Sequence, residues 1–337
     1  MELVLRHRRV DLSTHPPLVM GILNVTPDSF SDAGDHFAPA DATARAREMI
    51  SEGADIIDVG PESTRPGAEA VPSAEQIRRA VPVIEAIRSE FDAIPISIDT
   101  RSSRVAEAAL VAGADIINDV SALRDDNAMG ALAADTGVPV VLMHRKGTSA
   151  TMQQGGGPHY DDVIGEICTF LNARVEHAVN CGIASGRIIL DPGIGFGKRT
   201  EHNLLILRHL DRFVELGHPV LVGASRKSFI GAVMRDDHHT GHADAEPTVA
   251  VDRGSYARDI PISVHGGCTG GEHHTGGDPR HREAGSLACV AIAVMAGASI
   301  LRVHDVASTL AAVRVCAAVR ACARPTERHH LPAPPIR

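Results

Sequence analysis

Residues 299–307, SILRVHDVA, place side chains that can carry charge at the end of an apolar run. Apolar residues begin the segment, whereas Arg302, His304 and Asp305 crowd its end. Unpaired charges are rarely buried in a protein core. Because Arg302 and His304 are two residues apart, a strand would put them on one face and Val303 on the other. The pattern predicts a strand that delivers cationic groups to a site.

Seven other short apolar runs also finish in polar or chargeable residues. The runs are LVMGILNVT, ADIIDVG, IPISIDT, DIINDVS, VPVVLMH, RIILDPG and PVLVGAS. Their end residues are Asn24, Asp58, Asp99, Asn118 with Asp119, His144, Asp191, and Ser225 with Arg226 and Lys227. One such ending is compatible with a structural role. Eight endings with related chemistry indicate a shared site.

Acceptor groups form the first part of this chemistry. Asp99, Asn118 and Asp191 offer two carboxylates and an amide. Such a set suits a heterocycle rich in N–H donors, for example a 2-amino-4-oxo pyrimidine ring.

Cations form the second part. Lys227, Arg302 and His304 suit a phosphate or diphosphate, for which arginine supplies a rigid fork of donors. Asn24 offers a carbonyl oxygen to Mg²⁺, an ion that leans on substrate phosphates and keeps several waters. HExxH and clustered cysteines are absent from the sequence, which argues against a zinc site built from protein ligands alone.

Longer stretches of helical period separate the apolar runs, among them residues 73–91 and 201–217. Eight strands alternating with helices predict an α/β protein with a (β/α)₈ TIM barrel, in which active sites lie at the carboxyl ends of the strands. A doubly wound open sheet is the competing fold. It usually carries a GxGxxG loop after its first strand, where this chain has NVTPDSFSDAG.

Composition narrows the possible partners. The 337 residues are 44% hydrophobic and carry 33 Lys and Arg against 42 Asp and Glu, for a net charge of -9. An acidic balance and 3% aromatic residues argue against nucleic acid or an anionic membrane as the main partner. The apolar run 286–301 is shorter than the roughly 20 residues of a membrane helix. Six scattered cysteines without a CxxC pair indicate a reducing cytoplasm.

Eight motifs together resemble the dihydropteroate synthase family. In order they are MGILNVTPDSFSDAG, GPESTRPGAE, SIDT, INDVS, LMH, DPGIGFGK, VGASRKSFIG and LRVHDV. The resemblance implies a TIM-barrel transferase of folate biosynthesis. Such an enzyme joins 6-hydroxymethyl-7,8-dihydropterin diphosphate to 4-aminobenzoate, releases diphosphate, uses Mg²⁺ and is a target of sulfonamides. It also implies a homodimer, formed here through a helix at 306–322.

The resemblance also assigns site residues. It implies that the pterin is bound by Asp99, Asn118, Met143, Asp191 and Lys227. It implies that diphosphate is bound by Asn24, Arg65, Arg302 and His304, with Asn24 also toward the metal. It implies that 4-aminobenzoate is bound by Phe30, Thr64, Arg65, Pro66, Ser225 and Arg226. It implies that catalysis depends on Phe30, Asp32, Lys227, Arg302 and His304.

Two departures from the family pattern stand out. The first loop reads SDAG instead of SDGG, so Ala33 replaces a glycine that takes positive φ freely. A polar segment at about 237–280, after the seventh strand, has no counterpart, and its composition predicts a flexible surface insert. The barrel is expected to span 1–322 as one domain, with a disordered tail at 323–337.

Two other functions fit parts of this pattern. One is a catalytically silent paralogue that keeps the barrel and binds pterin or a partner protein. The other is a methyltetrahydrofolate-binding barrel, which shares the pterin-binding carboxylates and amide. Lost catalytic residues would favour the silent paralogue, and the sequence shows none lost. The methyltetrahydrofolate barrel has no need of the SRK and STRPG motifs or of a group of cations for diphosphate, so the pattern favours the synthase.

Overall fold

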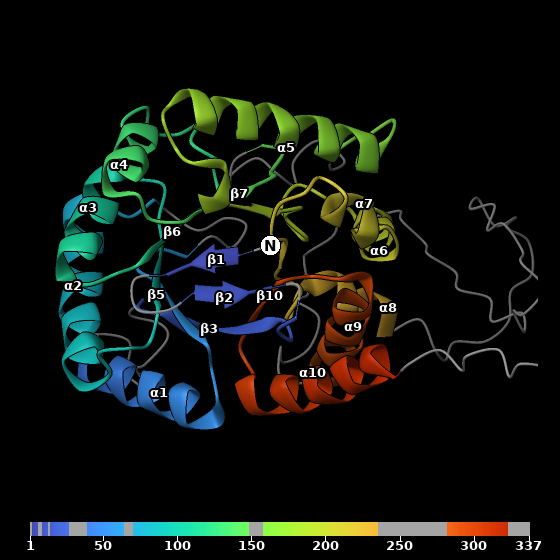
Figure 1. The fold of residues 1–337 in the computed structure, drawn as a ribbon, viewed down its shortest axis with the longest axis horizontal. Coiled ribbons are helices and arrows are strands. Elements are labelled where there is room, and N and C mark those ends of the chain that lie inside the picture. Colours follow the sequence, from blue (N-terminus) through green and yellow to red (C-terminus); the bar gives the residue numbers. More distant parts are fainter. Residues whose placement is uncertain are drawn as a thin grey trace, which may run out of the picture.

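The computed structural model describes residues 2–5, 9–12, 14–26, 39–63, 70–147, 158–234 and 282–322. Helices surround a ring of parallel strands (Figure 1). All eight predicted strands are present: β3 (Leu18–Asn24), β4 (Ile56–Gly60), β5 (Ile96–Asp99), β6 (Ile116–Asp119), β7 (Val140–Met143), β8 (Ile188–Asp191), β9 (Leu221–Val222) and β10 (Ile300–Val303).

The strands form one parallel sheet in the order β8-β7-β6-β5-β4-β3-β10-β9. A bridge between Leu190 and Val220 joins β8 to β9 and completes the ring. The TIM barrel predicted from the sequence is therefore confirmed. The predicted insert at 237–280, the tail at 323–337 and Ala33 lie outside the described residues.

Ten helices are described around the barrel. They are α1 (Pro39–Glu52), α2 (Ser73–Glu90), α3 (Ser103–Ala112), α4 (Met129–Thr136), α5 (Val163–Asn180), α6 (Thr200–Arg208), α7 (Leu210–Val214), α8 (Ser228–Met234), α9 (Glu283–Ala296) and α10 (Val306–Ala321), with a 3₁₀ turn at Ser185–Arg187. The helical stretch at 201–217 is two helices, because His209 leaves the helical region with φ -116° and ψ 32°. In the described part of the chain, no helix is long and apolar enough to span a membrane.

Alternation along the strands divides the core into two parts. In β10, Leu301 and Val303 pack outward against the helices, whereas Ile300 points into the barrel. The barrel interior contains Leu18, Met20, Ile56, Ile116, Val141, Ile189, Leu221 and Ile300. Two residues further along four of these strands come Asp58, Asn118, Asp191 and Arg302. Since side chains alternate with a period of two, a polar layer follows the apolar one inside the same barrel.

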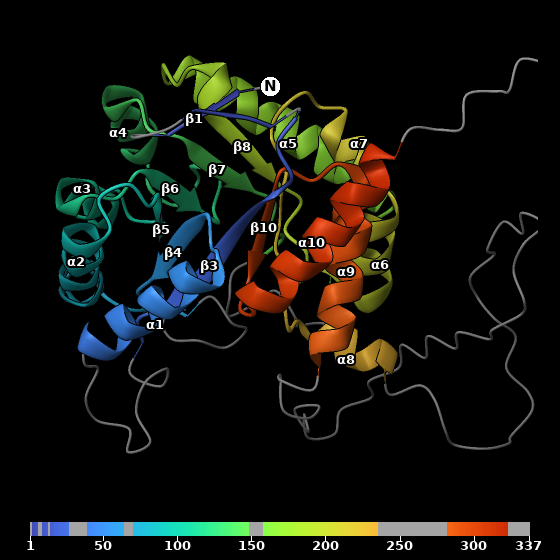
Figure 2. The ribbon, with the colours of Figure 1, turned by 60° about the horizontal axis from the view of Figure 1, so that its bottom comes forward.

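An N-terminal hairpin that the sequence did not lead us to expect covers one end of this apolar layer. It consists of β1 (Glu2–Val4) and β2 (Arg9–Asp11), paired antiparallel. Leu3, Leu5 and Val10 join the apolar cluster inside the barrel. Figure 2 shows β1 at the end of the barrel opposite α8. The hairpin therefore closes the amino-terminal end of the barrel and leaves the polar end open to loops.

We predict that Leu3→Ala lowers the free energy of unfolding by about 2–5 kcal/mol, because the side chain is 1% exposed within the barrel cluster. Val111→Ala is the control, since Val111 is 87% exposed, and a change within about 0.5 kcal/mol is expected. Urea denaturation measures both. A Leu3 variant as stable as the control would show that the hairpin does not seal the barrel in solution.

Candidate active site

Arg302 is the centre of the polar layer. Its Nε donates to Asp58 Oδ2 at 2.7 Å and its Nη2 donates to Asp99 Oδ2 at 2.8 Å. Asn118 Nδ2 adds a longer contact of 3.3 Å to Asp58 Oδ2. The Asp58 and Asp99 side chains are 0% and 6% exposed, so neither carboxylate is well hydrated. One guanidinium therefore joins the carboxyl ends of β4, β5 and β10 inside the barrel.

Burial sets the protonation of this layer. It raises the pKa of Asp99 to about 7; Arg302 opposes the rise, and the nearby charges of Asp58 and Asp119 add to it. Burial alone would lower the pKa of Arg302, but Asp58 and Asp99 outweigh it and the pKa is raised. Arg302 thus stays charged, whereas Asp99 can exchange a proton near neutral pH.

Asp191 and Lys227 lie beside this group. Asp191 Oδ1 accepts the N–H of Gly193 at 2.6 Å, and burial raises the pKa of Asp191 against the pull of Lys227. Lys227 Nζ donates to the carbonyl of Ile194 and lies 4.6 Å from the centre of the Phe196 ring. Burial lowers the pKa of Lys227 to about 8, and Asp191 opposes this shift. Burial therefore disfavours the charged form of both side chains, and each charge partly stabilises the other.

Backbone close packing shapes the loop after β8, which carries the DPGIGFGK motif. Gly193 has φ +70°, and an added Cβ would lie 1.8 Å from the carbonyl oxygen of His144. Gly197 has φ +61°, and its added Cβ would lie 2.1 Å from the carbonyl oxygen of Lys146. Only glycine fits either position without moving the β7 end. The two glycines therefore hold this loop against the residues that follow β7.

Lys198, whose role we did not predict, stabilises the loop after β8 through hydrogen bonds from its buried side chain. Its Nζ donates to the carbonyls of Gly193 at 2.8 Å and Phe196 at 3.1 Å, and lies 2.9 Å from His144 Nδ1. Burial lowers the pKa of His144, and the Lys198 charge lowers it further. His144 is therefore a neutral packing partner of Lys198. Met143, just before it, is buried and pairs with Asp191 in the β7–β8 ladder.

Ser225 and His304 join the ends of β9 and β10. Ser225 Oγ lies 3.0 Å from His304 Nδ1 and 3.3 Å from the His304 backbone N–H, which donates to it. Arg226, next to Ser225, forms an ion pair with Asp305. His304 is thus oriented by a hydroxyl at a position two residues beyond the half-buried Arg302.

Asn24 ends β3, beside Gly60 at the end of β4. Its Oδ1 lies 3.5 Å from the point that a Gly60 Cβ would occupy, so the amide lies directly against the end of β4. Within the described ranges no three His, Cys, Asp or Glu residues cluster as a metal site would need. The donor chemistry fits an oxygen-seeking Mg²⁺ that takes most of its ligands from substrate and water.

The structure brings the predicted pterin residues together and leaves other predicted residues undescribed. Asp99, Asn118, Asp191 and Lys227 share the polar end of the barrel with Arg302. Five predicted site residues lie outside the described residues: Phe30, Asp32, Thr64, Arg65 and Pro66.

Asp58, by contrast, was named among the polar strand ends but was given no role in the predicted site. It ends the run ADIIDVG, as the other site residues end theirs.

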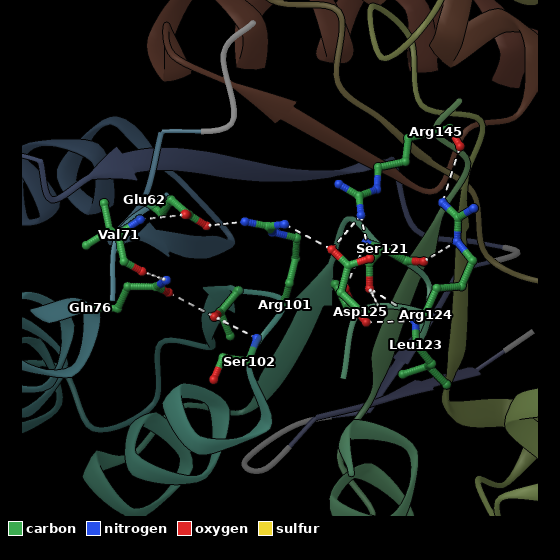
Figure 3. Close-up of polar contacts among 12 residues, drawn as sticks. Glu62, Val71, Gln76, Arg101, Ser102, Ser121, Leu123, Arg124, Asp125 and Arg145 are labelled. Carbon is green, nitrogen blue, oxygen red and sulfur yellow. Dashed lines mark hydrogen bonds and ion pairs between the residues drawn. The ribbon is translucent and has the colours of Figure 1, made fainter. Parts of the chain in front are cut away.

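An alternating chain of charges, also missed from the sequence, braces the rim (Figure 3). Glu62 accepts the Val71 N–H at 3.0 Å and pairs with Arg101 at 2.9 Å. Arg101 pairs with Asp125 at 2.9 Å, and Arg145 donates to the same carboxylate at 2.6 Å. The chain connects segments that follow β4, β5, β6 and β7, so it fixes the spacing of the strand ends that carry the site.

Comparisons with known proteins agree with this geometry. A family model described as "Pterin binding enzyme" matches residues 20–257. The dihydropteroate synthase of Escherichia coli K12 is 42% identical over 315 residues, which cover 94% of this chain and 95% of that protein.

Solved structures give the same result. Xanthomonas albilineans dihydropteroate synthase with 4-aminobenzoic acid has a TM-score of 0.76 and 42% identity, with 95% of this chain and 98% of that chain covered. The same enzyme in complex with 7,8-dihydropteroate has a TM-score of 0.73 and 39% identity, covering 95% and 99%. The chain therefore belongs to the dihydropteroate synthase family of pterin-binding enzymes.

Proposed function

We propose that this chain is a transferase that condenses 6-hydroxymethyl-7,8-dihydropterin diphosphate with 4-aminobenzoate to give 7,8-dihydropteroate and diphosphate. The observation that carries the proposal is the buried polar layer, in which acceptor groups and cations meet at the carboxyl ends of the strands. The related enzyme from Xanthomonas albilineans has been solved with 4-aminobenzoic acid and with 7,8-dihydropteroate, which supports the same amine substrate and the same product here.

The pterin ring occupies the acceptor side of the layer in this proposal. Asp99, Asn118 and Asp191 accept its N–H groups, while Lys227 donates to its carbonyl or ring nitrogen. Met143 packs beside the ring, since it is buried next to Asp191. A ring N–H that donates to Asp99 competes with the hydrogen bond that Arg302 Nη2 donates to the same carboxylate at 2.8 Å. Pterin binding thereby loosens one of the two contacts of Arg302.

Diphosphate lies on the cation side, with Asn24, Arg65, Arg302 and His304 around it. Mg²⁺ held by Asn24 and the diphosphate oxygens would neutralise charge on the leaving group. His304 is oriented by Ser225, whose Oγ lies 3.0 Å from His304 Nδ1. Arg302 donates to diphosphate through the Nη2 that pterin binding releases from Asp99. These groups stabilise the negative charge that gathers on diphosphate as the bond breaks.

The reaction needs no protein nucleophile. The C–O bond between the pterin methylene and diphosphate breaks, and diphosphate leaves with the electron pair. The amine nitrogen of 4-aminobenzoate then forms a bond to the methylene carbon and loses a proton. In this proposal Ser225 belongs to the amine side, together with Phe30, Asp32, Thr64 and Pro66. The protein's part is to orient both substrates and to balance charge.

Detection of 7,8-dihydropteroate by mass spectrometry tests the proposal. The chain is incubated with the pterin diphosphate, 4-aminobenzoate and Mg²⁺, and separately without each component. Product that requires both substrates and disappears with a chelator supports the synthase and its metal. Pterin binding without product would indicate the silent paralogue instead. Binding of methyltetrahydrofolate without product would indicate the other pterin-binding barrel.

His304→Ala is expected to lower kcat by about 100-fold while the free energy of unfolding stays near that of the wild type. The imidazole lies at the strand end rather than in the apolar core, so its loss removes charge balance and not packing. His177→Ala on α5 is the matched control, because His177 is an exposed histidine away from the strand ends. Near-normal turnover of His304→Ala would remove it from the diphosphate site.

Pterin affinity should rise with pH through the raised pKa of Asp99. Below about 7 the free protein carries a proton on Asp99, whose pKa is about 7 instead of the usual 3.8. A ring N–H binds more strongly to the ionised carboxylate than to the protonated one, so binding favours release of that proton. Calorimetry with 6-hydroxymethylpterin, which lacks the titrating diphosphate, should give about tenfold weaker binding at pH about 6 than at pH about 7.5.

Asp99→Asn is the control for this pH dependence, because an amide does not titrate. The variant should bind more weakly at every pH and lose most of the slope. An equally steep slope in the variant would assign the titration to another group.

We also propose that the chain forms a homodimer through α9 and α10. Exposed apolar side chains gather on these adjacent helices: Ile292 and Met295 on α9 are 45% and 51% exposed, and Val315 and Val319 on α10 are 65% and 57% exposed. Val315 and Val319 are four residues apart and share a helix face. Apolar area of this kind favours a second copy of the chain.

Light scattering should therefore give a dimer mass for the wild type and a monomer mass for Val315→Glu/Val319→Glu. Val111→Glu, at an exposed apolar residue on α3, is the control and should remain a dimer. A wild-type monomer at micromolar concentration would contradict the proposed interface.

A further inference from the structure

Arg226 has an unusual backbone conformation between two residues of the proposed site. It lies between Ser225, which contacts His304, and Lys227, which lies over Phe196. Its φ is +59°, in the left-handed region that residues with side chains seldom adopt. Such a conformation persists where the surrounding structure fixes it, and it often occurs at functional sites.

The guanidinium of Arg226 is held by a carboxylate of the same protein. Its Nε donates to Asp305 Oδ2 at 3.0 Å and its Nη2 donates to Asp305 Oδ1. The two side chains are 28% and 23% exposed, so the pair is partly shielded from water. This two-point contact uses the fork that a substrate carboxylate would otherwise take.

The backbone of Arg226 is bound as well. Its N–H donates to Ser286 Oγ at 3.0 Å, and its carbonyl accepts from Arg282 Nη1 at 2.9 Å. Ser286 Oγ in turn donates to the Arg282 carbonyl at 2.8 Å. Asp305 directly precedes α10, whereas Arg282 and Ser286 lie at the start of α9. Both the side chain and the backbone of this one residue are therefore tied to the last two helices.

We propose that Arg226 is a positioning residue, locked by Asp305, and that it does not bind the carboxylate of 4-aminobenzoate. This inference rests on the proposed function. The left-handed turn at Arg226 directs Ser225 toward His304 and Lys227 toward the loop after β8. Because Ser225 and Lys227 lie on the sides of different substrates, loss of the lock disturbs both sides at once. A direct ligand would affect one substrate alone.

The pair of variants Arg226→Gly and Arg226→Ala separates these roles. Neither has a guanidinium, but glycine adopts positive φ freely, whereas alanine adopts it only at an energetic cost. The positioning role predicts that Arg226→Ala raises KM for both substrates and lowers kcat, and that Arg226→Gly recovers about tenfold in kcat/KM over Arg226→Ala. A direct ligand predicts equal losses in both variants, confined to KM for the arylamine substrate.

Asp305→Asn supplies the second arm of the experiment. If Asp305 locks Arg226, this variant is impaired toward both substrates, and Arg226→Ala/Asp305→Asn is no worse than Arg226→Ala. If Arg226 binds 4-aminobenzoate, Asp305→Asn frees the guanidinium and leaves KM for the arylamine substrate unchanged or lower. That result, or additive losses in the double variant, would overturn the proposal.

Wild-type turnover is measured first, so that failure of the proposed function can be distinguished from failure of the positioning role of Arg226. A wild type that makes no dihydropteroate contradicts the proposed function. An active wild type with Arg226→Gly no better than Arg226→Ala contradicts only the positioning role. Calorimetry with 6-hydroxymethylpterin on the same variants needs no turnover. The positioning role predicts weaker pterin binding in Arg226→Ala than in Arg226→Gly, because Lys227 is displaced.

Discussion

The ion pairs of Arg302 with Asp58 and Asp99 are the interaction on which the site depends. Two carboxylates with almost no exposed surface lie inside the barrel, and each is within 2.8 Å of the same guanidinium. Buried charges are tolerated when they are paired and hydrogen-bonded, and removal of one partner is strongly destabilising. The barrel can therefore hold a charged layer only as a balanced set.

An excess of acceptor groups also prepares the layer for its ligand. Three carboxylates, Asp58, Asp99 and Asp191, stand against the cations of Arg302 and Lys227. The set has more acceptor capacity than its own donors use. Burial disfavours the charged carboxylates and raises the pKa of both Asp99 and Asp191. A flat ring with several N–H groups supplies the missing donors. When that ring binds, its N–H groups replace the contact of Arg302 with Asp99, and the guanidinium becomes available to diphosphate.

Sequence alone predicted the strands well because each obeys a local rule. Apolar runs that end in polar residues predicted all eight barrel strands, and the period of two predicted the opposite directions of Arg302 and Val303. The sequence did not predict which side chains from distant strands contact one another inside the barrel. Arg302 meets Asp58 although 244 residues separate them, and nothing in either run indicates the pair.

The other omissions have similar causes. The β1–β2 hairpin is stabilised by the apolar cluster that it covers, and its own short strands gave little signal. Lys198 was part of a recognised motif, yet its contacts with His144 and Gly193 exist only because the β8 loop folds back on β7. The rim chain from Glu62 to Arg145 likewise depends on strand order around the barrel.

The most direct measurement compares the free energies of unfolding of Arg302→Met and of Arg302→Met/Asp58→Asn/Asp99→Asn. Arg302→Met leaves two buried carboxylates without their cation and should lose about 3–5 kcal/mol. Because the two asparagines remove the uncompensated charge and keep the shape, the triple variant should regain most of that loss. A triple variant no more stable than Arg302→Met would show that charge balance at Arg302 is not the constraint on which this site is built.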